Sequence, residues 1–277
     1  MVIQFLRWLN LRANKKAKDL FKKETAEVSS VSRANFERDG FLVFRNCLDE
    51  AICEEAKTFV LDSLEPLIGP AELEVDVGYP GAPAGDKEVG SETPRRLLHA
   101  YGRAPIMRRI ASHENVRRVI CELMEDEAVM LSQCHHNCVM TKFPKYSSVT
   151  GWHQDIRYWH FDFPELVSVW IALDQEDELN GALQVIPGSH KIDFGRGDFD
   201  KDWFFREDNE KSQALLENQV SIGLNRGDLL FFHCRLLHSA GQNLSDKVKL
   251  SPVFTYHRSS NQPIVGTRSA RFPSITV

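Results

Sequence analysis

The spacing of hydrophobic residues changes along the chain and separates a helical part from a β part. Through residues 105–125, apolar residues recur at three- or four-residue steps, which is the period of one helical face. From about residue 128 they form short runs rich in Val, Phe, Trp and Thr between turn residues, which is the pattern of strands. This second pattern predicts strands over residues 128–133, 135–142, 167–173, 182–186, 219–222, 228–233 and 249–257.

The segments before and between these strands complete the predicted fold. Residues 35–64 predict a short helix, a turn at Gly40, a strand over Phe41–Phe44, and a helix that Asp49 caps. Residues 66–94 hold five prolines and five glycines and predict a long loop, typical of lids and binding loops. Residues 190–217 predict an irregular insertion with a short helix. We therefore expect a mainly β fold with helices (α+β), a barrel flanked by N-terminal helices, in a single domain over residues 31–277.

Residues 1–30 differ from the rest of the chain. The first 23 residues carry seven basic residues and one acid, and their apolar residues recur at helical spacing. A basic amphipathic helix of this kind either docks on its own domain or lies on an anionic membrane surface. We predict a basic amphipathic helix or extension here, with peripheral membrane contact through residues 1–23 as the alternative to docking.

The composition excludes several classes of protein. With 34 Lys and Arg against 39 Asp and Glu, the net charge is −5 at pH 7, so we expect no nucleic-acid partner. A hydrophobic fraction of 42% argues against disorder, and six cysteines without CxxC spacing do not form a disulfide scaffold. No apolar run reaches the ~18 residues of a membrane span. The predicted location is the cytoplasm, with membrane association as the alternative.

Candidate chemistry begins with His153 and Asp155. Two residues apart on a strand, an imidazole and a carboxylate emerge on the same face. A second histidine would complete a 2-His-1-carboxylate facial triad, which holds iron(II) and leaves positions open for substrate and oxygen. The residues themselves leave two histidines open for this place. His233 ends an apolar strand, and His238 stands at the junction of a strand and a turn.

Taken alone, this pair is a weak signal. In a chain with ten histidines such a pair arises by chance, and it then most often forms a surface hydrogen bond. A second histidine-rich segment, Cys134-His-His-Asn-Cys138, suggests zinc. On a strand, however, alternate residues face opposite sides and would separate those ligands. Neither segment decides the chemistry without its context.

The context resembles the phytanoyl-CoA dioxygenase family of iron(II)- and 2-oxoglutarate-dependent oxygenases. Five segments match in order and spacing over roughly residues 34–257. They are Phe36-Glu-Arg-Asp-Gly-Phe-Leu-Val-Phe44, Trp152-His-Gln-Asp-Ile-Arg-Tyr-Trp159, Val169-Trp-Ile-Ala-Leu173, Asn180-Gly-Ala-Leu-Gln-Val-Ile-Pro-Gly-Ser-His-Lys191, and Gly227-Asp-Leu-Leu-Phe-Phe-His233 through His238. The resemblance implies a double-stranded β-helix, the jelly-roll or cupin-like barrel.

The resemblance also implies the centre and its cofactors. His153, Asp155 and His238 become the catalytic metal ligands for Fe(II), with 2-oxoglutarate as cosubstrate, and His233 becomes a structural neighbour. The family commonly holds the far carboxylate of 2-oxoglutarate with an arginine about eleven residues after the last ligand. Here that position is Lys249, which supplies a cation without arginine's bidentate fork.

Further contacts follow from the same resemblance. Ser251 stands on the strand face of the lysine and is predicted to add a hydroxyl to the cosubstrate site. Trp170, Cys138 and Arg96 map onto other cosubstrate contacts. The alternative for Trp170 is an aromatic residue of the core, and the alternative for Cys138 is a small buried thiol. We predict that the basic residues flanking the 66–94 loop, with Arg157 and Tyr158, meet the substrate.

The implied reaction is hydroxylation of a C–H bond in a small-molecule or lipid-like substrate, with succinate and carbon dioxide as co-products. The carboxylate of Asp155 favours hydroxylation over halogenation, because related halogenases replace it with a small residue. The alternative is a catalytically inactive metal-binding barrel that acts as a binding or interaction protein. A zinc hydrolase on a similar barrel would need a general base beside an open metal position, and the sequence offers no clear candidate.

Overall fold

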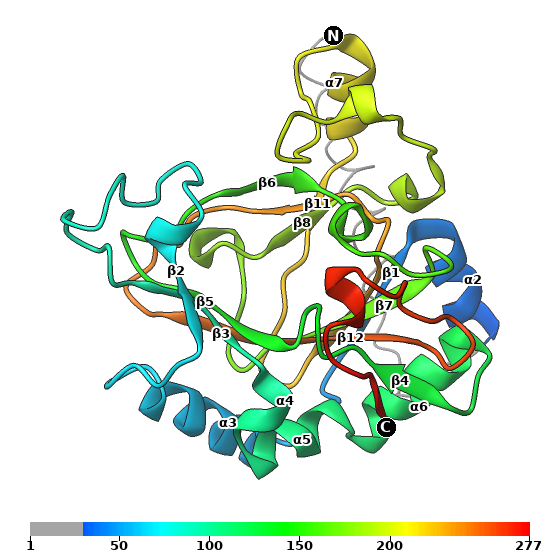
Figure 1. Ribbon diagram of the computed structural model, residues 1–277, viewed down its shortest axis with the longest axis horizontal. Helices are drawn as coiled ribbons and strands as arrows, with labels where there is room; N and C mark the ends of the chain where they lie inside the picture. Colours follow the sequence, from blue (N-terminus) through cyan, green and yellow to red (C-terminus); the bar gives the residue numbers. More distant parts are fainter. Residues whose placement is uncertain (1–29) are drawn as a thin grey trace, which may run out of the picture.

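The computed structural model describes residues 30–277, which form two facing antiparallel sheets with helices on one side (Figure 1). The expectations for residues 1–23, and for an extension over residues 1–30, fall outside the described residues apart from Ser30. Within the described part, no helix is both long and apolar enough to cross a membrane.

The larger sheet has nine strands in the described residues, and its main path runs β1-β10-β7-β12-β5-β3-β2. Its strands are β1 (Phe41–Phe44), β2 (Ala71–Leu73), β3 (Pro94–Leu98), β4 (Val129–Leu131), β5 (Cys138–Lys142), β7 (Leu166–Ile171), β10 (Leu229–His233), β12 (Lys249–Arg258) and β13 (Ile275–Thr276). The ten-residue strand β12 joins this sheet together, because it pairs with β7, β5 and β4 along its length.

The smaller sheet has the order β6-β11-β8-β9, with β6 (Thr150–His153), β8 (Leu183–Val185), β9 (Val220–Ser221) and β11 (His238–Ala240). It faces the larger sheet across a cluster of buried side chains that includes Val43, Val185, Leu230 and Val253. This arrangement confirms the predicted jelly-roll fold. The sheets remain two separate layers, so the fold is not a closed barrel.

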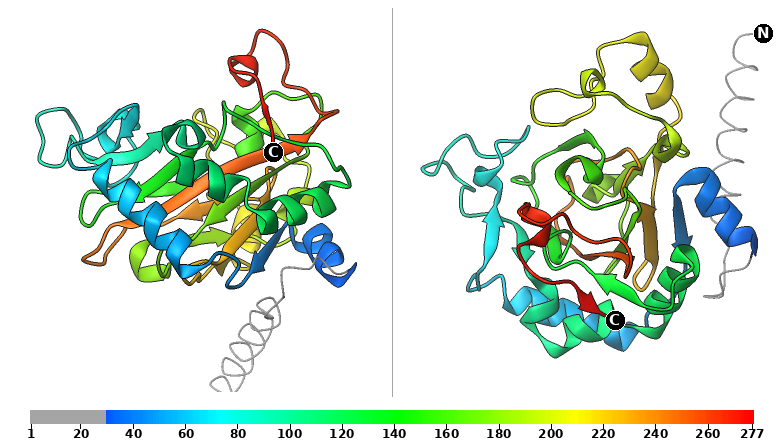
Figure 2. Two further views of the ribbon diagram at one scale, coloured as in Figure 1. Left: turned by 90° about the horizontal axis from the view of Figure 1, so that it is seen from below. Right: turned by 45° about the vertical axis from the view of Figure 1, so that its right-hand side comes forward.

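Helices cover the outer face of the larger sheet (Figures 1 and 2). They are α3 (Glu50–Asp62), α4 (Ala100–Arg103), α5 (Pro105–Ala111) and α6 (Glu114–Met124), and α2 (Ser30–Asp39) lies beside β1. Apolar faces of α3, α5 and α6 pack on the sheet in the largest buried cluster, which includes Ala56, Ile110, Ile120 and Phe254. The predicted helical spacing in residues 105–125 is therefore the spacing of a sheet-facing surface.

Every strand predicted from the β texture is present within a few residues of its expected bounds. The predicted loop over residues 66–94 holds only β2 and a 3-10 turn at Glu74–Asp76, and the 190–217 insertion holds the short helix α7 (Glu210–Leu216). The hydrophobic pattern missed β2, β3, β6, β11 and β13, none of which has three apolar residues in a row. Two of these strands, β6 and β11, carry the histidines of the triad.

Candidate active site

The two histidines of the predicted triad lie on neighbouring strands of the smaller sheet. His153 is the last residue of β6, His238 is the first of β11, and the antiparallel register sets them directly opposite each other. Their ring centroids are 4.2 Å apart. Of the two histidines that the residues left open as third ligand, the fold therefore brings His238 to the pair.

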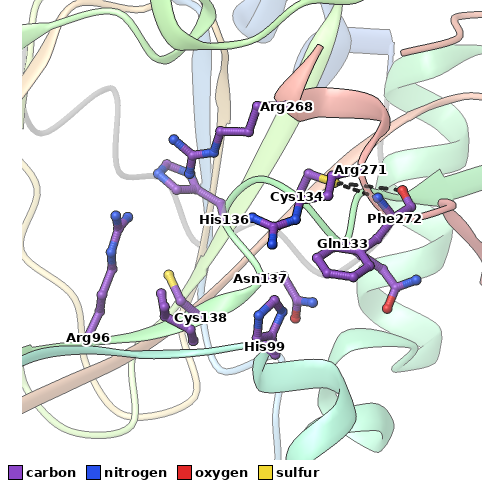
Figure 3. A pocket seen from close by; sticks show the side chains of 11 residues that line it. Arg96, His99, Gln133, Cys134, His136, Asn137, Cys138, Arg268, Arg271 and Phe272 are labelled. Atoms are coloured by element: carbon purple, nitrogen blue, oxygen red, sulfur yellow. Dashed lines mark hydrogen bonds between the residues drawn. The ribbon is translucent and has the colours of Figure 1, made fainter. Parts of the chain in front are cut away.

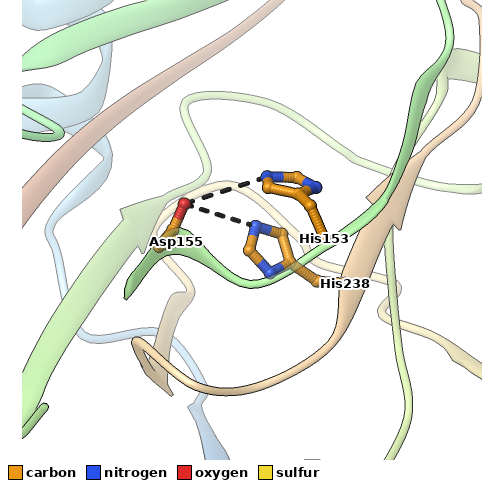
Figure 4. Close-up of side chains that lie close together, drawn as sticks. All are labelled: His153, Asp155 and His238. Carbon is orange, nitrogen blue, oxygen red and sulfur yellow. Dashed lines mark ion pairs between the residues drawn. The ribbon is translucent and has the colours of Figure 1, made fainter. Parts of the chain in front are cut away.

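Asp155 reaches this position by a turn and not by strand alternation. Strand β6 ends at His153, and Asp155 begins the 3-10 helix Asp155–Tyr158. The expectation that both residues share one strand face is therefore wrong, because the chain leaves the sheet after His153. The turn still directs the carboxylate back toward both imidazoles (Figure 4). One ligand atom from each of the three residues fits within 4.8 Å of the others.

Both histidines are held in the tautomer that suits a metal ligand. Nδ1 of His153 lies 2.9 Å from the carbonyl of Gly151, and Nδ1 of His238 lies 3.0 Å from the carbonyl of Leu236. A carbonyl only accepts, so each Nδ1 donates and each Nε2 keeps its lone pair. These Nε2 atoms face Asp155 Oδ1 at 3.8 and 3.9 Å.

Burial keeps the two imidazoles neutral and leaves the carboxylate without its own partner. Burial lowers the pKa of His238 to about 4 and holds the pKa of His153 well below its usual range. Burial also raises the pKa of Asp155 well above its usual value, and its buried Oδ2 has no hydrogen-bond partner. An unsatisfied buried carboxylate costs free energy unless a cation neutralises it. The donor set therefore fits a divalent metal ion.

His136 is a neighbour of the triad that sequence reasoning missed. Its Nε2 lies 3.5 Å from Asp155 Oδ1, and its Nδ1 lies 3.2 Å from the hydroxyl of Ser168. The segment from Cys134 to His136 is a loop before β5, with His136 at φ 38°, so the strand alternation expected there does not apply. Among the described residues, only the predicted triad has the geometry of a metal site. The histidine-rich segment therefore gives one neighbour of the metal centre and no zinc site.

A cavity of about 240 Å³ opens from the triad between the two sheets. Tyr79 and Val77 of the 66–94 loop line it, so this loop forms part of its wall, as a lid or binding loop does. The cavity is rich in basic residues. They are Arg95, Arg96, Lys142, Lys249 and Arg268, and they face only Glu72 and Asp155 among the lining acids. Such a cavity favours anionic groups.

Arg96 and Cys138 lie beside a second pocket that adjoins the first. Arg96, His136 and Arg268 line both pockets, and Figure 3 shows the side chains of His136 and Arg268 next to each other. Arg96 donates to Glu72 at 2.6 Å and points into the shared space. Cys138 lines only the second pocket, where its thiol lies 3.8 Å from the sulfur of Met140.

The two predicted substrate residues are placed differently from each other. Tyr158 lines the main cavity, and its hydroxyl donates to the carbonyl of Asp202 at 2.9 Å. Arg157 does not line it. Its guanidinium lies over the ring of Phe199 and donates to the carbonyl of Phe194, both in the 190–217 insertion. Neighbouring positions on a 3-10 turn point in different directions, which sequence spacing alone did not resolve.

Lys249, Ser251 and Trp170 converge on one carboxylate, that of Glu176. Lys249 Nζ donates to Glu176 Oε2 at 3.0 Å, Ser251 Oγ donates to Oε1 at 2.7 Å, and Trp170 Nε1 lies 3.0 Å from both oxygens. The side chains of Lys249 and Glu176 are only 3% and 2% exposed. Lys249 and Trp170 also line the main cavity. Sequence reasoning missed Glu176, although the lysine in an arginine position was a signal of change there.

Lys142 is the buried neighbour of Lys249, directly opposite it in the β5–β12 register. Its ammonium donates to the carbonyl of Ser148 at 2.8 Å. Burial and, to a smaller extent, the charge of Lys249 lower the pKa of Lys142 to about 7, although Glu74 acts in the opposite direction. Two lysines of the cavity lining are therefore direct neighbours, and one of them, Lys249, is bound by the buried Glu176.

Comparison with known proteins agrees with this geometry. The sequence profile of the phytanoyl-CoA dioxygenase (PhyH) family matches residues 36–251, more than three-quarters of the chain. The chain belongs to the phytanoyl-CoA dioxygenase family. Its relatives include an ectoine dioxygenase of Sphingopyxis alaskensis, 24% identical over 86% of this chain and 78% of the relative. A probable phytanoyl-CoA dioxygenase of Caenorhabditis elegans is 21% identical over 82% of this chain and 74% of the relative.

Solved structures share the fold of this chain. EctD from S. alaskensis, determined with 2-oxoglutarate and 5-hydroxyectoine, matches with a TM-score of 0.68 at 19% identity, over 88% of this chain and 80% of that one. The epimerase SnoN, determined with Fe3+, alpha-ketoglutarate and nogalamycin RO, matches with a TM-score of 0.66 at 22% identity, over 83% and 84%. At the level of the family, the predicted enzyme class, a non-haem iron 2-oxoglutarate-dependent dioxygenase, and its cofactors are confirmed.

Proposed function

We propose that this PhyH-family protein hydroxylates a C–H bond of a small organic substrate with iron(II), 2-oxoglutarate and dioxygen. One oxygen atom of dioxygen enters the product as a hydroxyl group and the other enters succinate, with release of carbon dioxide. The observation that carries the proposal is the triad. The Nε2 lone pairs of His153 and His238 and the unpartnered oxygen of Asp155 lie together at the cavity.

The residues of this chain have separate tasks in the reaction. His153, Asp155 and His238 hold the metal, which supplies the site where dioxygen and the 2-oxo acid react. The carbonyls of Gly151 and Leu236 fix the two imidazole rings through Nδ1. A retained carboxylate at position 155 supports hydroxylation, since it fills the place that halogenases leave to a halide.

The rest of the cavity orients the substrate and excludes water. Tyr79 of the 66–94 loop and Tyr158 of the 3-10 turn line the cavity with the triad, and Arg96 and Arg268 add positive charge to its lining. We infer a substrate with an anionic group. The proposed location is the cytoplasm, and contact of residues 1–23 with a membrane stays a prediction.

Succinate release tests the proposal. Purified protein with iron(II), ascorbate, 2-oxoglutarate and oxygen is expected to form succinate, even uncoupled from a substrate, and His153→Ala is expected to form none. Hydroxylation is then scored by a mass gain of one oxygen atom in a screen of anionic small molecules. No succinate from the wild type, together with no 2-oxo acid binding by its iron(II) form, would contradict the proposal.

The alternative function, a metal-binding barrel without catalysis, has one observation in its favour. The cation predicted to anchor 2-oxoglutarate is already paired with Glu176. A non-catalytic protein would bind iron(II) through the same triad without consuming a 2-oxo acid. Parallel measurements of metal binding and of succinate therefore separate the two functions.

A further inference from the structure

We propose that Glu176 sets the cosubstrate selectivity of this enzyme, by filling with its own carboxylate the ionic position that otherwise receives the far carboxylate of 2-oxoglutarate. The inference rests on the proposed function, because it concerns the 2-oxo acid that the iron centre consumes. It predicts that the second carboxylate of 2-oxoglutarate gains little here, and that a 2-oxo acid without one binds about equally well.

The first support is that the donors at this position are already satisfied. Lys249, Ser251 and Trp170 are three of the five residues expected to contact the cosubstrate, and all three bind the Glu176 carboxylate at 2.7 to 3.0 Å. Hydrogen bonds to a charged group are among the strongest in proteins. A ligand carboxylate must displace or share these donors.

The second support is charge. The lysine and the glutamate form a buried pair with no net charge, and each side chain is at most 3% exposed. A second carboxylate placed at Lys249 would lie beside the carboxylate of Glu176, and two like charges at such distance repel strongly in a buried site. An uncharged end of a 2-oxo acid meets no such repulsion.

The third support is that Glu176 cannot move out of the way as a loop would. Its backbone N–H donates to the carbonyl of Leu224 at 2.8 Å, and its carbonyl accepts from Leu224 N–H at 2.9 Å. This two-way bridge fixes the backbone at a position where the side chain is 2% exposed. With this backbone fixed and three donors on the carboxylate, Glu176 is held directly behind Lys249 and Trp170, which line the cavity.

Binding to the iron(II) protein under anaerobic conditions tests the inference. The probes are 2-oxoglutarate and 2-oxopentanoate, which has the same five carbons with a methyl group in place of the far carboxylate. Dissociation constants come from calorimetry and from the visible charge-transfer band of the iron–2-oxo acid complex. For the wild type we expect the two constants to agree within about threefold.

The variant Glu176→Gln keeps the shape and removes the negative charge. We expect it to bind 2-oxoglutarate at least about tenfold more tightly than the wild type, a change of about 1.4 kcal/mol, and 2-oxopentanoate within about twofold. The matched control is Asp228→Asn, which removes a buried carboxylate that Arg45 binds outside the lining of the cavity. It is expected to leave the preference between the two acids unchanged.

Three outcomes would overturn the inference. One is a wild type that prefers 2-oxoglutarate by tenfold or more, a result that needs no folded variant; loss of this preference in Lys142→Met would then assign the anchor to Lys142. Another is an unchanged preference in Glu176→Gln. The third is an equal gain in Asp228→Asn, which would mean a general effect of charge. Binding of neither acid by the iron(II) wild type would instead contradict the proposed function itself.

Discussion

Two buried carboxylates differ in how they are satisfied: Asp155 lines the active-site cavity, and Glu176 lies behind its lining residues Lys249 and Trp170. Asp155 has one oxygen facing three histidine nitrogens and the other without a partner. Glu176 has both oxygens bound by a lysine, a serine and a tryptophan. We call the Asp155 site the incomplete end, because its carboxylate can still bind a cation. We call the Glu176 site the complete end, because it already contains the ion pair that a ligand would otherwise form.

The largest effect is expected from the loss of a metal ligand at the incomplete end. Replacing His238 with Ala removes one of two neutral imidazole ligands, so we expect iron(II) binding to be lost and succinate formation to fall at least about a thousandfold, or ~4 kcal/mol in the barrier. His233→Ala is the matched control, because its Nδ1 accepts from the backbone N–H of Arg235 and it lies outside the triad. Equal losses in both variants would contradict the assignment of His238.

The next largest effect is expected from the loss of the cation at the complete end. Lys249→Met leaves the Glu176 carboxylate buried without its cation, and removing one partner of a buried pair typically costs about 3–5 kcal/mol. We expect the free energy of unfolding to fall by that amount in urea titrations. The double variant Lys249→Met with Glu176→Leu removes both charges and is expected to recover most of the loss. Additive losses in the double variant would show that the pair is not coupled.

A smaller effect concerns the second lysine at the complete end. The pKa of Lys142 is lowered to about 7 from 10.5, so above pH 7 the unfolded chain binds more protons at this residue than the folded chain does. Stability should therefore rise with pH from 7 to about 8.5, by up to ~1.4 kcal/mol per pH unit. Lys142→Met is expected to flatten this slope in urea titrations. The range stops below pH 9, where buried thiols with raised pKa values, such as Cys138, act in the opposite direction.

The smallest effect is expected from the loss of one hydrogen-bond donor to Glu176. Ser251→Ala removes one of the three donors to Glu176 and is expected to lower the free energy of unfolding by about 1 kcal/mol. A loss of this size, with no change in iron(II) affinity, would show that the incomplete and complete ends are energetically separate. A fall in iron affinity would contradict that separation.

Sequence reasoning predicted the incomplete end well and the complete end poorly. Strand texture and the family resemblance located His153, Asp155 and His238, because metal ligands are few and their chemistry is specific. The ion partner of Lys249 is 73 residues away along the chain, within the acidic run of residues 174–178. Such a run is typical of a solvated surface. Glu176 is buried because its backbone pairs with Leu224, a contact that no local pattern predicts.

Strands β6 and β11 and the direction of Arg157 were not predicted from the sequence, also because long-range contacts determine them. Strands β6 and β11 each contain a single apolar residue, Trp152 and Ala240, so no hydrophobic strand pattern is visible there. Their positions are set by long-range pairing with each other and with β8, which no local pattern encodes. The direction of Arg157, away from the cavity, follows from a 3-10 turn that the sequence did not reveal.

The fixed backbone of Glu176 has a consequence for how the family diverges. Because positions 176 and 249 share one buried pair of opposite charges, a change at either alone leaves an isolated ion. An arginine that binds 2-oxoglutarate has the ligand as its anion, so we expect the two positions to covary among family members, with an uncharged residue at 176 wherever 249 is the family's usual arginine. An alignment in which the two positions vary independently would contradict this expectation.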